Sequence, residues 1–247
     1  MERIVYKKTK ALSDAPLSYC PGCTHGIIHK LVGEVLEELD ILDRSIGLAS
    51  VGCSVMSYFY FNCDMVQAAH GRSCAVATGI KRSRPDKIVF TYQGDGDFAS
   101  IGIAEGIHAA NRGENITAIL VNNAIYGMTG GQMAPTTLIG QKTTTSQLGR
   151  VEDQHGLPMK VSEMFATIPK AAYVARVSVD SPQAVKKAKE ALKKAFTYQI
   201  ENKGFTLVEF LSTCPINWGK TPMDSIKWVR EEMIKYYPLG TYKDIGE

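Results

Sequence analysis

Two short polar motifs contain the residue types that bind a metal ion and a phosphate group. Gly94-Asp95-Gly96-Asp97 follows the apolar run 87–92, and Asn122-Asn123 follows the apolar run 116–121. Twenty-five residues, 97–121, separate Gly96 from Asn122. An apolar strand, a turn, a helix and a second strand in this order form a right-handed βαβ unit of a parallel sheet. We therefore expect Asp95 and Asn123 to lie together at one edge of that sheet.

The oxygen atoms of these motifs suit magnesium, which prefers oxygen ligands and usually shares them with phosphates. Asp95 offers a charged oxygen, Asn123 a neutral one, and the carbonyl of Ile125 a third. Gly94 and Gly96 allow the main chain to approach a phosphate, and the helix expected from about residue 98 directs its N-terminus at the same place. The alternative is two ordinary tight turns, in which Gly, Asp and Asn are common.

The rest of the chain alternates between short apolar runs and helical patterns. We predict strands at residues 46–51, 87–92, 116–121, 172–179 and 205–211. We predict helices at residues 27–40, 73–79, 98–112 and 182–201, the last with Ser181 as N-cap before Pro182. This alternation is typical of an α/β fold, namely a doubly wound, mostly parallel sheet with helices on both faces. Ligands of such folds bind at the carboxyl ends of the strands.

Three further segments have no repeating apolar pattern. Residues 1–18 are polar and are expected to form an extended arm that lies on the body or on a partner. Residues 124–149 form a long loop rich in Gly and Thr, which we interpret as a loop that covers the site. The C-terminal 30 residues are amphipathic and are expected to be helical up to Tyr237.

The composition is that of an ordinary soluble globular protein. The chain has 247 residues, of which 45% are hydrophobic and 21% charged, and its net charge is +3. This charge is too balanced to indicate nucleic-acid binding. Every apolar run is shorter than the ~18 residues that span a bilayer, and the N-terminus has no signal-peptide core. We therefore expect a cytoplasmic location and no membrane partner.

Six cysteines in a cytoplasmic chain favour metal or redox chemistry over disulfides. Cys20-Pro-Gly-Cys23 is compatible with half of a zinc site, a thioredoxin-type redox pair or half of an iron–sulfur cluster. A redox pair would follow an apolar strand, which residues 1–18 do not supply. Cys53 and Cys214 would complete either a zinc site or a [4Fe–4S] site, so spacing leaves both open. Cys63 and Cys74 are interpreted as small buried apolar side chains.

The order of the motifs points to a known family. The Gly-Asp-Gly and Asn-Asn pair resembles the thiamine-pyrophosphate motif of thiamine-dependent enzymes. Over residues 15–220 the chain closely resembles the β subunit of 2-oxoacid:ferredoxin oxidoreductases, which is the subunit that binds thiamine pyrophosphate. This likeness depends on Tyr-Cys-Pro-Gly-Cys at 19–23, Gly-Cys-Ser at 52–54, His-Gly-Arg at 70–72, Gly-Asp-Gly-Asp at 94–97 and Tyr-Gly-Met-Thr-Gly-Gly-Gln at 126–132.

The resemblance implies roles for particular residues. Asp95, Asn123 and Ile125 would hold Mg²⁺ on the pyrophosphate, and Cys20, Cys23, Cys53 and Cys214 would hold a [4Fe–4S] cluster. The cofactor would be lined by Val51, Gly52, Cys53, Ser54, His70, Gly94, Gly96, Asp97, Gly127 and Met128. His70 is otherwise a loop histidine, and for Arg72 a site role and a surface role remain equally open.

The resemblance also implies partners, because thiamine enzymes pair a pyrophosphate domain with a pyrimidine domain that carries an activating glutamate. We interpret residues 1–247 as a single thiamine-pyrophosphate-binding domain with an N-terminal cysteine arm and a C-terminal helical extension. An α subunit would then supply the pyrimidine domain and the glutamate, and γ and ferredoxin-like δ subunits are expected beside it. The enzyme would convert a 2-oxoacid and coenzyme A to acyl-CoA and CO2, with electrons passing through the cluster to ferredoxin.

The substrate is the least determined part of this interpretation. Family members that favour 2-oxoglutarate can have a lysine where this chain has Gly130, so we predict a branched-chain 2-oxoacid such as 3-methyl-2-oxobutanoate. A 2-oxoglutarate- or pyruvate-specific enzyme is the alternative within the family. Outside it, a non-redox thiamine-dependent decarboxylase subunit and a zinc-binding interaction module remain.

Overall fold

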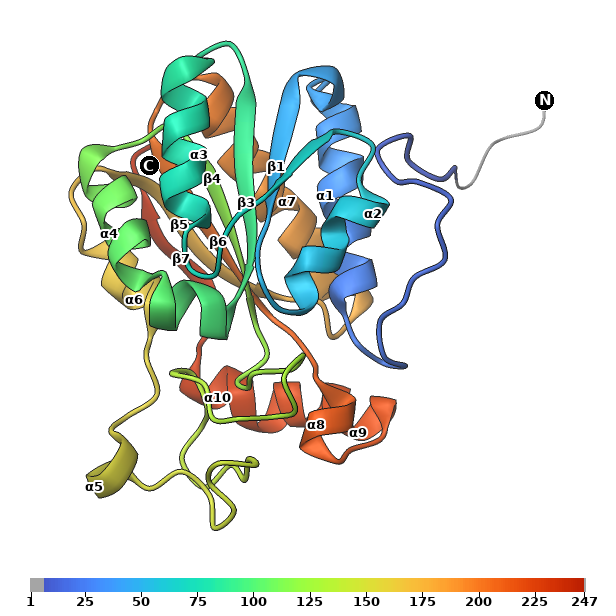
Figure 1. Ribbon diagram of the computed structural model, residues 1–247, viewed down its shortest axis with the longest axis vertical. Coiled ribbons are helices and arrows are strands. Elements are labelled where there is room, and N and C mark those ends of the chain that lie inside the picture. The colour runs from blue at the N-terminus through green and yellow to red at the C-terminus, as the bar shows by residue number, and fades with distance from the viewer. Residues whose placement is uncertain (1–6, 247) are drawn as a thin grey trace.

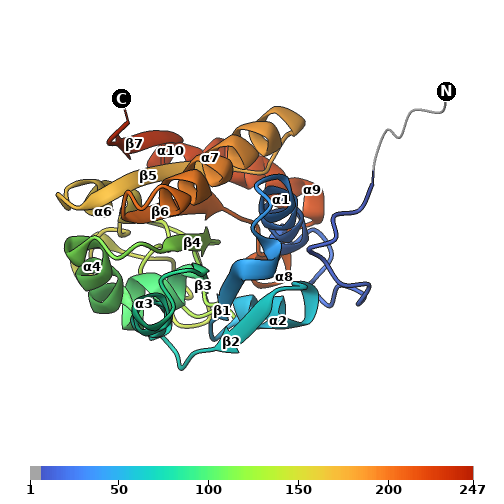
Figure 2. The ribbon, with the colours of Figure 1, turned by 90° about the horizontal axis from the view of Figure 1, so that it is seen from above.

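The computed structural model describes residues 7–246 and contains a seven-stranded sheet between two layers of helices (Figures 1 and 2). The strand order is β2-β1-β3-β4-β6-β5-β7, in which the first six strands are parallel and β7 runs antiparallel to β5. The strands are β1 Ser45–Ala49, β2 Asp64–Gln67, β3 Ile88–Gly94, β4 Thr117–Asn122, β5 Ala171–Ser178, β6 Phe205–Leu211 and β7 Gly240–Asp244. The predicted fold class is confirmed.

The five predicted strands are the buried ones. Every residue of β4, β5 and β6 is buried, as expected for parallel strands covered on both faces. The two edge strands, β2 and β7, were not predicted. Both are short and mostly exposed or half-buried, so they have no continuous apolar run that would mark them in the sequence.

Helices cover both faces of the sheet. α1 and α7 pack on one face, and α3, α4 and α6 on the other (Figure 2). The helices are α1 His25–Glu38, α2 Ser57–Tyr60, α3 Ser73–Ser83, α4 Ile103–Arg112, α5 Glu152–His155, α6 Val161–Ala166, α7 Pro182–Ile200, α8 Pro215–Trp218, α9 Pro222–Trp228 and α10 Ile234–Tyr236. Ser181 caps α7 by accepting the N–H of Ala184, as predicted. Within residues 7–246, each helix is too short or too polar to cross a bilayer.

The helix predicted at residues 98–112 starts differently from the prediction. A π-helical turn, η3 Asp97–Ile101, comes first, and α4 begins at Ile103. The wide turn places Asp97 at the start of the helix, directly after the Gly-Asp-Gly segment. Single π turns of this kind are frequent at functional sites.

The C-terminal segment is helical up to Tyr236, which agrees with the prediction. α8, α9, the π turn η4 Val229–Met233 and α10 follow each other beyond the carboxyl ends of the strands (Figure 1). They pack on Ala124 and Leu138 of the long loop in a small apolar cluster of their own. The chain then returns to the sheet as β7.

The described part of the N-terminal arm lies on the body. Thr9 and Ala11 are buried, and Leu12 bridges to Phe61. Residues 1–6 of the predicted arm lie outside the described residues.

The loop 124–149 contains no helix or strand, and with α5 it projects from the body (Figure 1). Its conformation depends on Arg150, whose guanidinium group is buried and donates hydrogen bonds to six carbonyl groups. These belong to Ala134, Pro135, Thr137, His155, Gly156 and Leu157, at donor–acceptor distances of 2.8–3.3 Å. One side chain therefore joins both ends of the projecting segment.

Replacing Arg150 with Met is expected to loosen this segment without unfolding the sheet. Leaving even one of these carbonyls unpaired costs about 1–3 kcal/mol, so amide exchange within residues 134–157 should accelerate about tenfold or more. Hydrogen exchange with mass spectrometry measures this. Arg84→Met is the matched control, because Arg84 is exposed and pairs with its neighbour Asp86. Equal protection of residues 134–157 in the Arg150 variant and the wild type would contradict the assigned role.

Candidate active site

The residues singled out in the sequence lie around one cavity at the carboxyl edge of the sheet. Its lining includes all ten predicted cofactor-binding residues and the three predicted magnesium ligands. The cavity volume is about 110 Å³, whereas sites that enclose a small molecule usually measure about 300–1,000 Å³. The described chain therefore forms part of a site rather than an enclosed pocket.

Asp95 and Asn123 are neighbours because β3 and β4 are neighbours. The register pairs Gly94 with Val121, so the next residues of both strands emerge side by side. Asp95 is 2% exposed and accepts a hydrogen bond from Thr136 on the long loop. Burial raises the pKa of Asp95 to about 7, although hydrogen bonds from Thr136 and main-chain N–H groups oppose this. A cation in front of the carboxylate would offset the same desolvation.

The turn after β4 has an unusual main-chain conformation. Ala124 has φ of 56°, a left-handed value that is uncommon for a residue with a side chain. Asn122 holds the turn from one side by accepting the N–H of Ala124, and Thr137 and Gln141 donate to the carbonyl of Ala124 from the other. The turn thus holds Asn123 and Ile125 in the lining of the cavity.

The oxygen set fits a magnesium ion that is shared with a pyrophosphate. Asp95 is the single carboxylate among the three predicted ligands, with Asn123 and Ile125 as neutral donors. Within residues 7–246 there is no group of three or more His, Cys, Asp or Glu side chains positioned to hold a single ion. Magnesium sites that use one or two carboxylates and complete their octahedron with phosphate oxygens do not need such a group.

Asp97 is a hub of hydrogen bonds rather than a free carboxylate. His70 and the N–H of Gly71 donate to one oxygen, and Ser50 and Gln93 donate to the other. An ionised carboxylate only accepts, so His70 uses its Nδ1–H here and leaves Nε2 for the cavity. The predicted lining residue Asp97 therefore orients His70.

Tyr126 explains why Gly96 must be glycine. The ring of Tyr126 occupies the place that a Cβ at position 96 would take, and its hydroxyl donates to the carbonyl of Gly96 at 3.0 Å. The sequence suggested instead that Gly96 allows a phosphate to approach. The structure adds close packing within the chain as a second requirement.

The four predicted cluster ligands come together beside this cavity. Cys20 and Cys23 form a tight turn, in which the N–H of Cys23 donates to the carbonyl of Cys20 at 3.0 Å. A Cβ placed on Gly127 would lie 3.4 Å from the sulfur of Cys214 and 3.5 Å from that of Cys53, so both thiols face the same point. All six cysteines of the chain are free.

The four thiols also interact electrostatically. Burial is the main cause that raises the pKa of Cys23 to about 12 and of Cys53 to about 11, and the other cysteines of the group add to both shifts. The same causes raise the pKa of Cys214, against hydrogen bonds from Asn217. With pKa values raised in this way, Cys23, Cys53 and Cys214 are protonated thiols at neutral pH unless a cationic centre is bound. Their arrangement fits a centre larger than a single ion.

A cluster of aromatic side chains around Tyr19 and His25 packs beside Cys53. Tyr19 stacks on His25 at 4.6 Å between ring centroids, and its hydroxyl donates to the carbonyl of Cys53. His25 and His29 are buried among Tyr19, Tyr60 and Tyr92. Burial lowers the pKa of His25 to about 4, so this wall is uncharged at neutral pH.

Three residues with open roles lie away from the cavity lining. Arg72 is exposed and pairs with Glu105 of α4, so it has a structural contact. Cys74 is buried and donates to Gln93 at 3.4 Å, and Cys63 contacts Met65. Cys74 is the small buried side chain that was predicted, whereas Cys63 is only half-buried.

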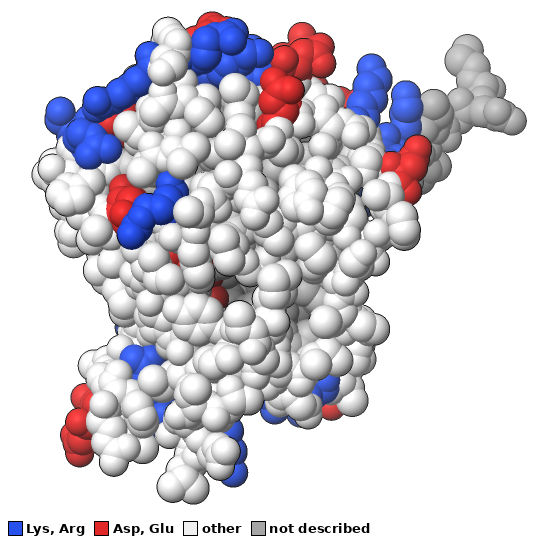
Figure 3. All heavy atoms as spheres, viewed as in Figure 1, with Lys and Arg blue, Asp and Glu red and all other residues white. Residues whose placement is uncertain are grey.

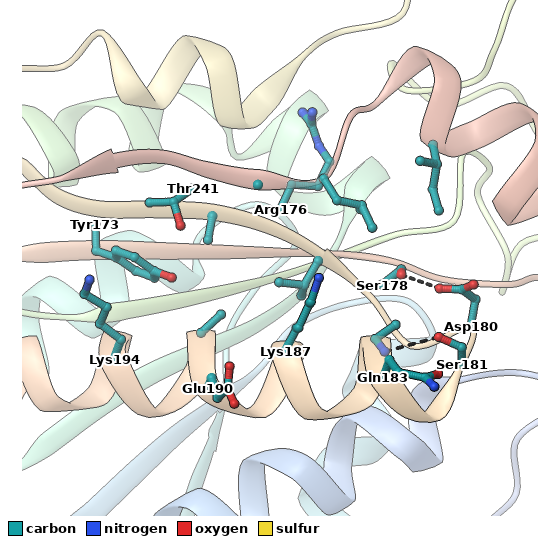
Figure 4. A pocket seen from close by; sticks show the side chains of 17 residues that line it. Tyr173, Arg176, Ser178, Asp180, Ser181, Gln183, Lys187, Glu190, Lys194 and Thr241 are labelled. Atoms are coloured by element: carbon teal, nitrogen blue, oxygen red, sulfur yellow. Dashed lines mark hydrogen bonds between the residues drawn. The ribbon is translucent and has the colours of Figure 1, made fainter.

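A larger cavity lies elsewhere, in the groove between α7 and the strands β5 and β7 (Figure 4). Its volume is about 630 Å³. The polar groups at its end already bind one another, since Ser178 donates to Asp180 and Ser181 accepts the N–H of Ala184 (Figure 4). None of the residues predicted to bind the cofactor, the magnesium ion or the cluster lines it, and we assign it no chemistry.

Several site residues were not found from the sequence. His25, Val121, Tyr126 and Thr129 line the cavity, and Thr136, Ser50 and Gln93 hold Asp95 or Asp97. A site role for Tyr126 could have been predicted, because Tyr126 belongs to the motif at 126–132. Thr136 is one of six Thr residues in the loop 124–149, and its sequence position gives no sign of its contact.

Comparisons with known proteins agree with this geometry. Residues 50–210 match the family described as "Thiamine pyrophosphate enzyme, C-terminal TPP binding domain". A ketoisovalerate oxidoreductase subunit VorA of Methanothermobacter thermautotrophicus is 44% identical over 97% of this chain and 50% of the relative. A 2-oxoglutarate synthase subunit KorB of Methanocaldococcus jannaschii is 39% identical over 94% of this chain and 83% of the relative.

A solved structure is also similar. The 2-oxoglutarate:ferredoxin oxidoreductase from Magnetococcus marinus, with 2-oxoglutarate, coenzyme A and succinyl-CoA bound, aligns with a TM-score of 0.80 at 30% identity. The alignment covers 97% of this chain and 85% of the solved one. The chain spans about half the length of the ketoisovalerate oxidoreductase subunits that it matches.

Gly96→Ala is expected to destabilise the fold by about 1–3 kcal/mol, because the new methyl group would displace the Tyr126 ring. Chemical denaturation measures the free energy of unfolding. Gly94→Ala is the matched control, since a Cβ at Gly94 has no atom within 4 Å; its effect should stay within about 0.5 kcal/mol. Equal losses in both variants would show that packing against Tyr126 is not the constraint.

Proposed function

The chain belongs to the family of thiamine-pyrophosphate-binding β subunits of 2-oxoacid:ferredoxin oxidoreductases, and on this premise we propose that it performs the family's reaction together with partner chains. The reaction is the oxidative decarboxylation of a 2-oxoacid with coenzyme A to acyl-CoA and CO2. A [4Fe–4S] cluster on the four cysteines would supply the capacity for one-electron transfer to ferredoxin. The single observation that carries the proposal is the position of Cys53 and Cys214 beside the cavity with the Asp95–Asn123 pair, where they interact electrostatically with Cys20 and Cys23.

The roles of the site residues follow from their contacts. Asp95, Asn123 and the carbonyl of Ile125 would hold Mg²⁺ and through it the pyrophosphate of the cofactor. Thiamine pyrophosphate supplies, when bound, the nucleophilic carbon that allows a 2-oxoacid to lose CO2. Thr136 keeps the Asp95 carboxylate oriented, and Asp97 turns Nε2 of His70 toward the cavity. Cys20, Cys23, Cys53 and Cys214 would ligate the cluster.

The cavity supports the need for a partner. At about 110 Å³ it holds only part of a cofactor, which fits an α subunit that contributes the pyrimidine half and the activating glutamate. In the view of Figure 3, charged side chains gather along the upper and lower parts, and the belt between them is almost free of charge. Depletion of charge is typical of the core of a protein interface. γ and ferredoxin-like δ subunits belong to the same proposal.

We keep two further interpretations as part of the proposal. Residues 1–247 form one thiamine-pyrophosphate-binding unit, and the enzyme acts in the cytoplasm. Both agree with the continuous sheet and with helices too short or too polar for a bilayer in residues 7–246.

A branched-chain 2-oxoacid such as 3-methyl-2-oxobutanoate is the proposed substrate. One relative that is named a ketoisovalerate oxidoreductase subunit is 44% identical to this chain. Gly130, with φ of 109°, has open space around its Cβ position and offers no charge for a distal carboxylate. Identity of 39% to a 2-oxoglutarate synthase subunit keeps 2-oxoglutarate as the competing substrate.

The function is tested on the complex isolated with its partner chains without oxygen. We expect bound thiamine pyrophosphate, iron and sulfide, and CoA-dependent reduction of ferredoxin. We also expect a higher kcat/KM for 3-methyl-2-oxobutanoate than for pyruvate or 2-oxoglutarate. A preference for 2-oxoglutarate would overturn the substrate, and a complex without iron would overturn the redox reaction.

Asp95→Ala should abolish magnesium-dependent binding of thiamine pyrophosphate while the EPR spectrum of the reduced cluster stays nearly unchanged. Thr136→Val removes only the hydroxyl that orients Asp95 and should weaken binding by the roughly 10–100-fold typical of an outer-shell partner. Titration calorimetry with and without Mg²⁺ gives both affinities. Unchanged thiamine affinity in Asp95→Ala would refute the assignment of this carboxylate.

A further inference from the structure

The single helical turn α8 lies between the cysteines and the cofactor cavity. Cys214 is its N-cap residue, at the end of β6, and Asn217 is its third residue. The side-chain amide of Asn217 donates to the sulfur of Cys214 at 3.4 Å and to the carbonyl of Gly127 at 2.7 Å. One amide group therefore touches both a predicted cluster ligand and a residue of the cavity lining.

The position of this amide is fixed by its surroundings. Gly131 has φ of 83°, and a Cβ there would approach Oδ1 of Asn217 to 3.1 Å. A Cβ on Gly127 would likewise lie 3.4 Å from the sulfur of Cys214. Both glycines leave the space that the Asn217 side chain and the thiol occupy. A longer or branched side chain at either position would separate the amide from the sulfur.

Trp218, which follows Asn217 in α8, makes a further contact with the cavity lining. The indole N–H of Trp218 donates to the carbonyl of Asn123 at 3.2 Å. α8 thus joins the cysteine side to both the Asn123 turn and the Gly127 loop. A substitution of Asn217 removes the hydrogen bond to the Cys214 sulfur. It leaves the hydrogen bond from Trp218 to the Asn123 turn in place.

An N–H group that points at a cluster-bound thiolate favours the state with more negative charge. One-electron reduction takes [4Fe–4S]²⁺ to [4Fe–4S]⁺ and places one more negative charge on the cluster and its thiolates. Hydrogen bonds to the sulfurs are among the factors that set the reduction potential of such clusters. Hydrogen bonds to charged groups are the stronger ones.

We propose that Asn217 is a positioning residue that raises the reduction potential of the cluster through its hydrogen bond to Cys214. The inference rests on the proposed function, because it requires the cluster on the four cysteines. Its consequence is that the electron acceptor next to the thiamine site is tuned by a residue that also holds the thiamine-site loop.

The test is an EPR-monitored redox titration of the intact complex, with dithionite as the electron donor. In Asn217→Ala the donor is lost, so at a fixed potential the ratio of reduced to oxidised cluster should fall about three- to tenfold. A tenfold fall corresponds to about 59 mV for a one-electron couple. Asn217→Asp keeps the size of the side chain and puts an acceptor with a negative charge near the sulfur, so its potential should fall further.

Asn115→Ala is the matched control. The amide of Asn115 also donates to two groups, the carbonyl of Gln199 and the side chain of Asn202, but it precedes β4 at the opposite edge of the sheet. Its removal should leave the potential unchanged.

The outcomes separate the two levels of the proposal. A wild-type complex without iron or without a [4Fe–4S] spectrum contradicts the proposed function and this inference with it. Full iron content and an intact spectrum, with the wild-type potential in both Asn217 variants, contradict only the role of Asn217. Loss of the cluster in both variants also contradicts it, because Asn217 would then be needed for structure rather than for potential.

Discussion

The parallel hydrogen bonding of four buried strands is the constraint on which this site depends. β1, β3, β4 and β6 are neighbours with one direction, so the residue that follows each strand emerges at the same edge. That edge receives the loop with Cys53, the Asp95 turn, the Asn123 turn and Cys214, which are 161 residues apart from first to last in the chain. A shift of one residue in the register of a single strand would turn its ligand away.

Buried polar groups beneath the edge hold these turns in position. Glu209 of β6 is fully buried and accepts hydrogen bonds from Asn122 at 2.7 Å and from Arg176 of β5 at 2.9 Å. Asn122 is the residue whose side chain also holds the Ala124 turn. Breaking a buried ion pair of this kind costs about 3–5 kcal/mol, so the network is stable only when complete. The orientation of Asn123 thereby depends on a charge pair deep in the sheet.

The two proposed cofactors are adjacent because glycine allows it. Gly127 lies between the sulfurs of Cys53 and Cys214 and the amide of Asn123: a Cβ there would touch all three at 3.4–3.6 Å, so the space has room for a methyl group and for nothing longer. Short separation between the thiamine carbon and the cluster is what single-electron transfer requires. Residues 125–129 of the long loop line the cavity, and α8 contacts the same part of the loop through the hydrogen bond from Asn217 to the carbonyl of Gly127.

The buried strands, the α/β class and the residues of the two turns could be predicted from the amino-acid sequence. Continuous apolar runs and Gly, Asp and Asn at their ends are local signals, and the cysteine motif is local as well. The exposed edge strands β2 and β7 and the π turn at Asp97–Ile101 carry no such signal. Only the tertiary structure decided that Thr136 orients Asp95, that Arg150 joins both ends of the projecting loop, and that Asn217 reaches Cys214 and Gly127. The Thr136 and Arg150 contacts depend on how irregular loop segments meet in space. The Asn217 contacts depend on the direction of one side chain in a single helical turn, which is too short to show a periodic pattern in the sequence.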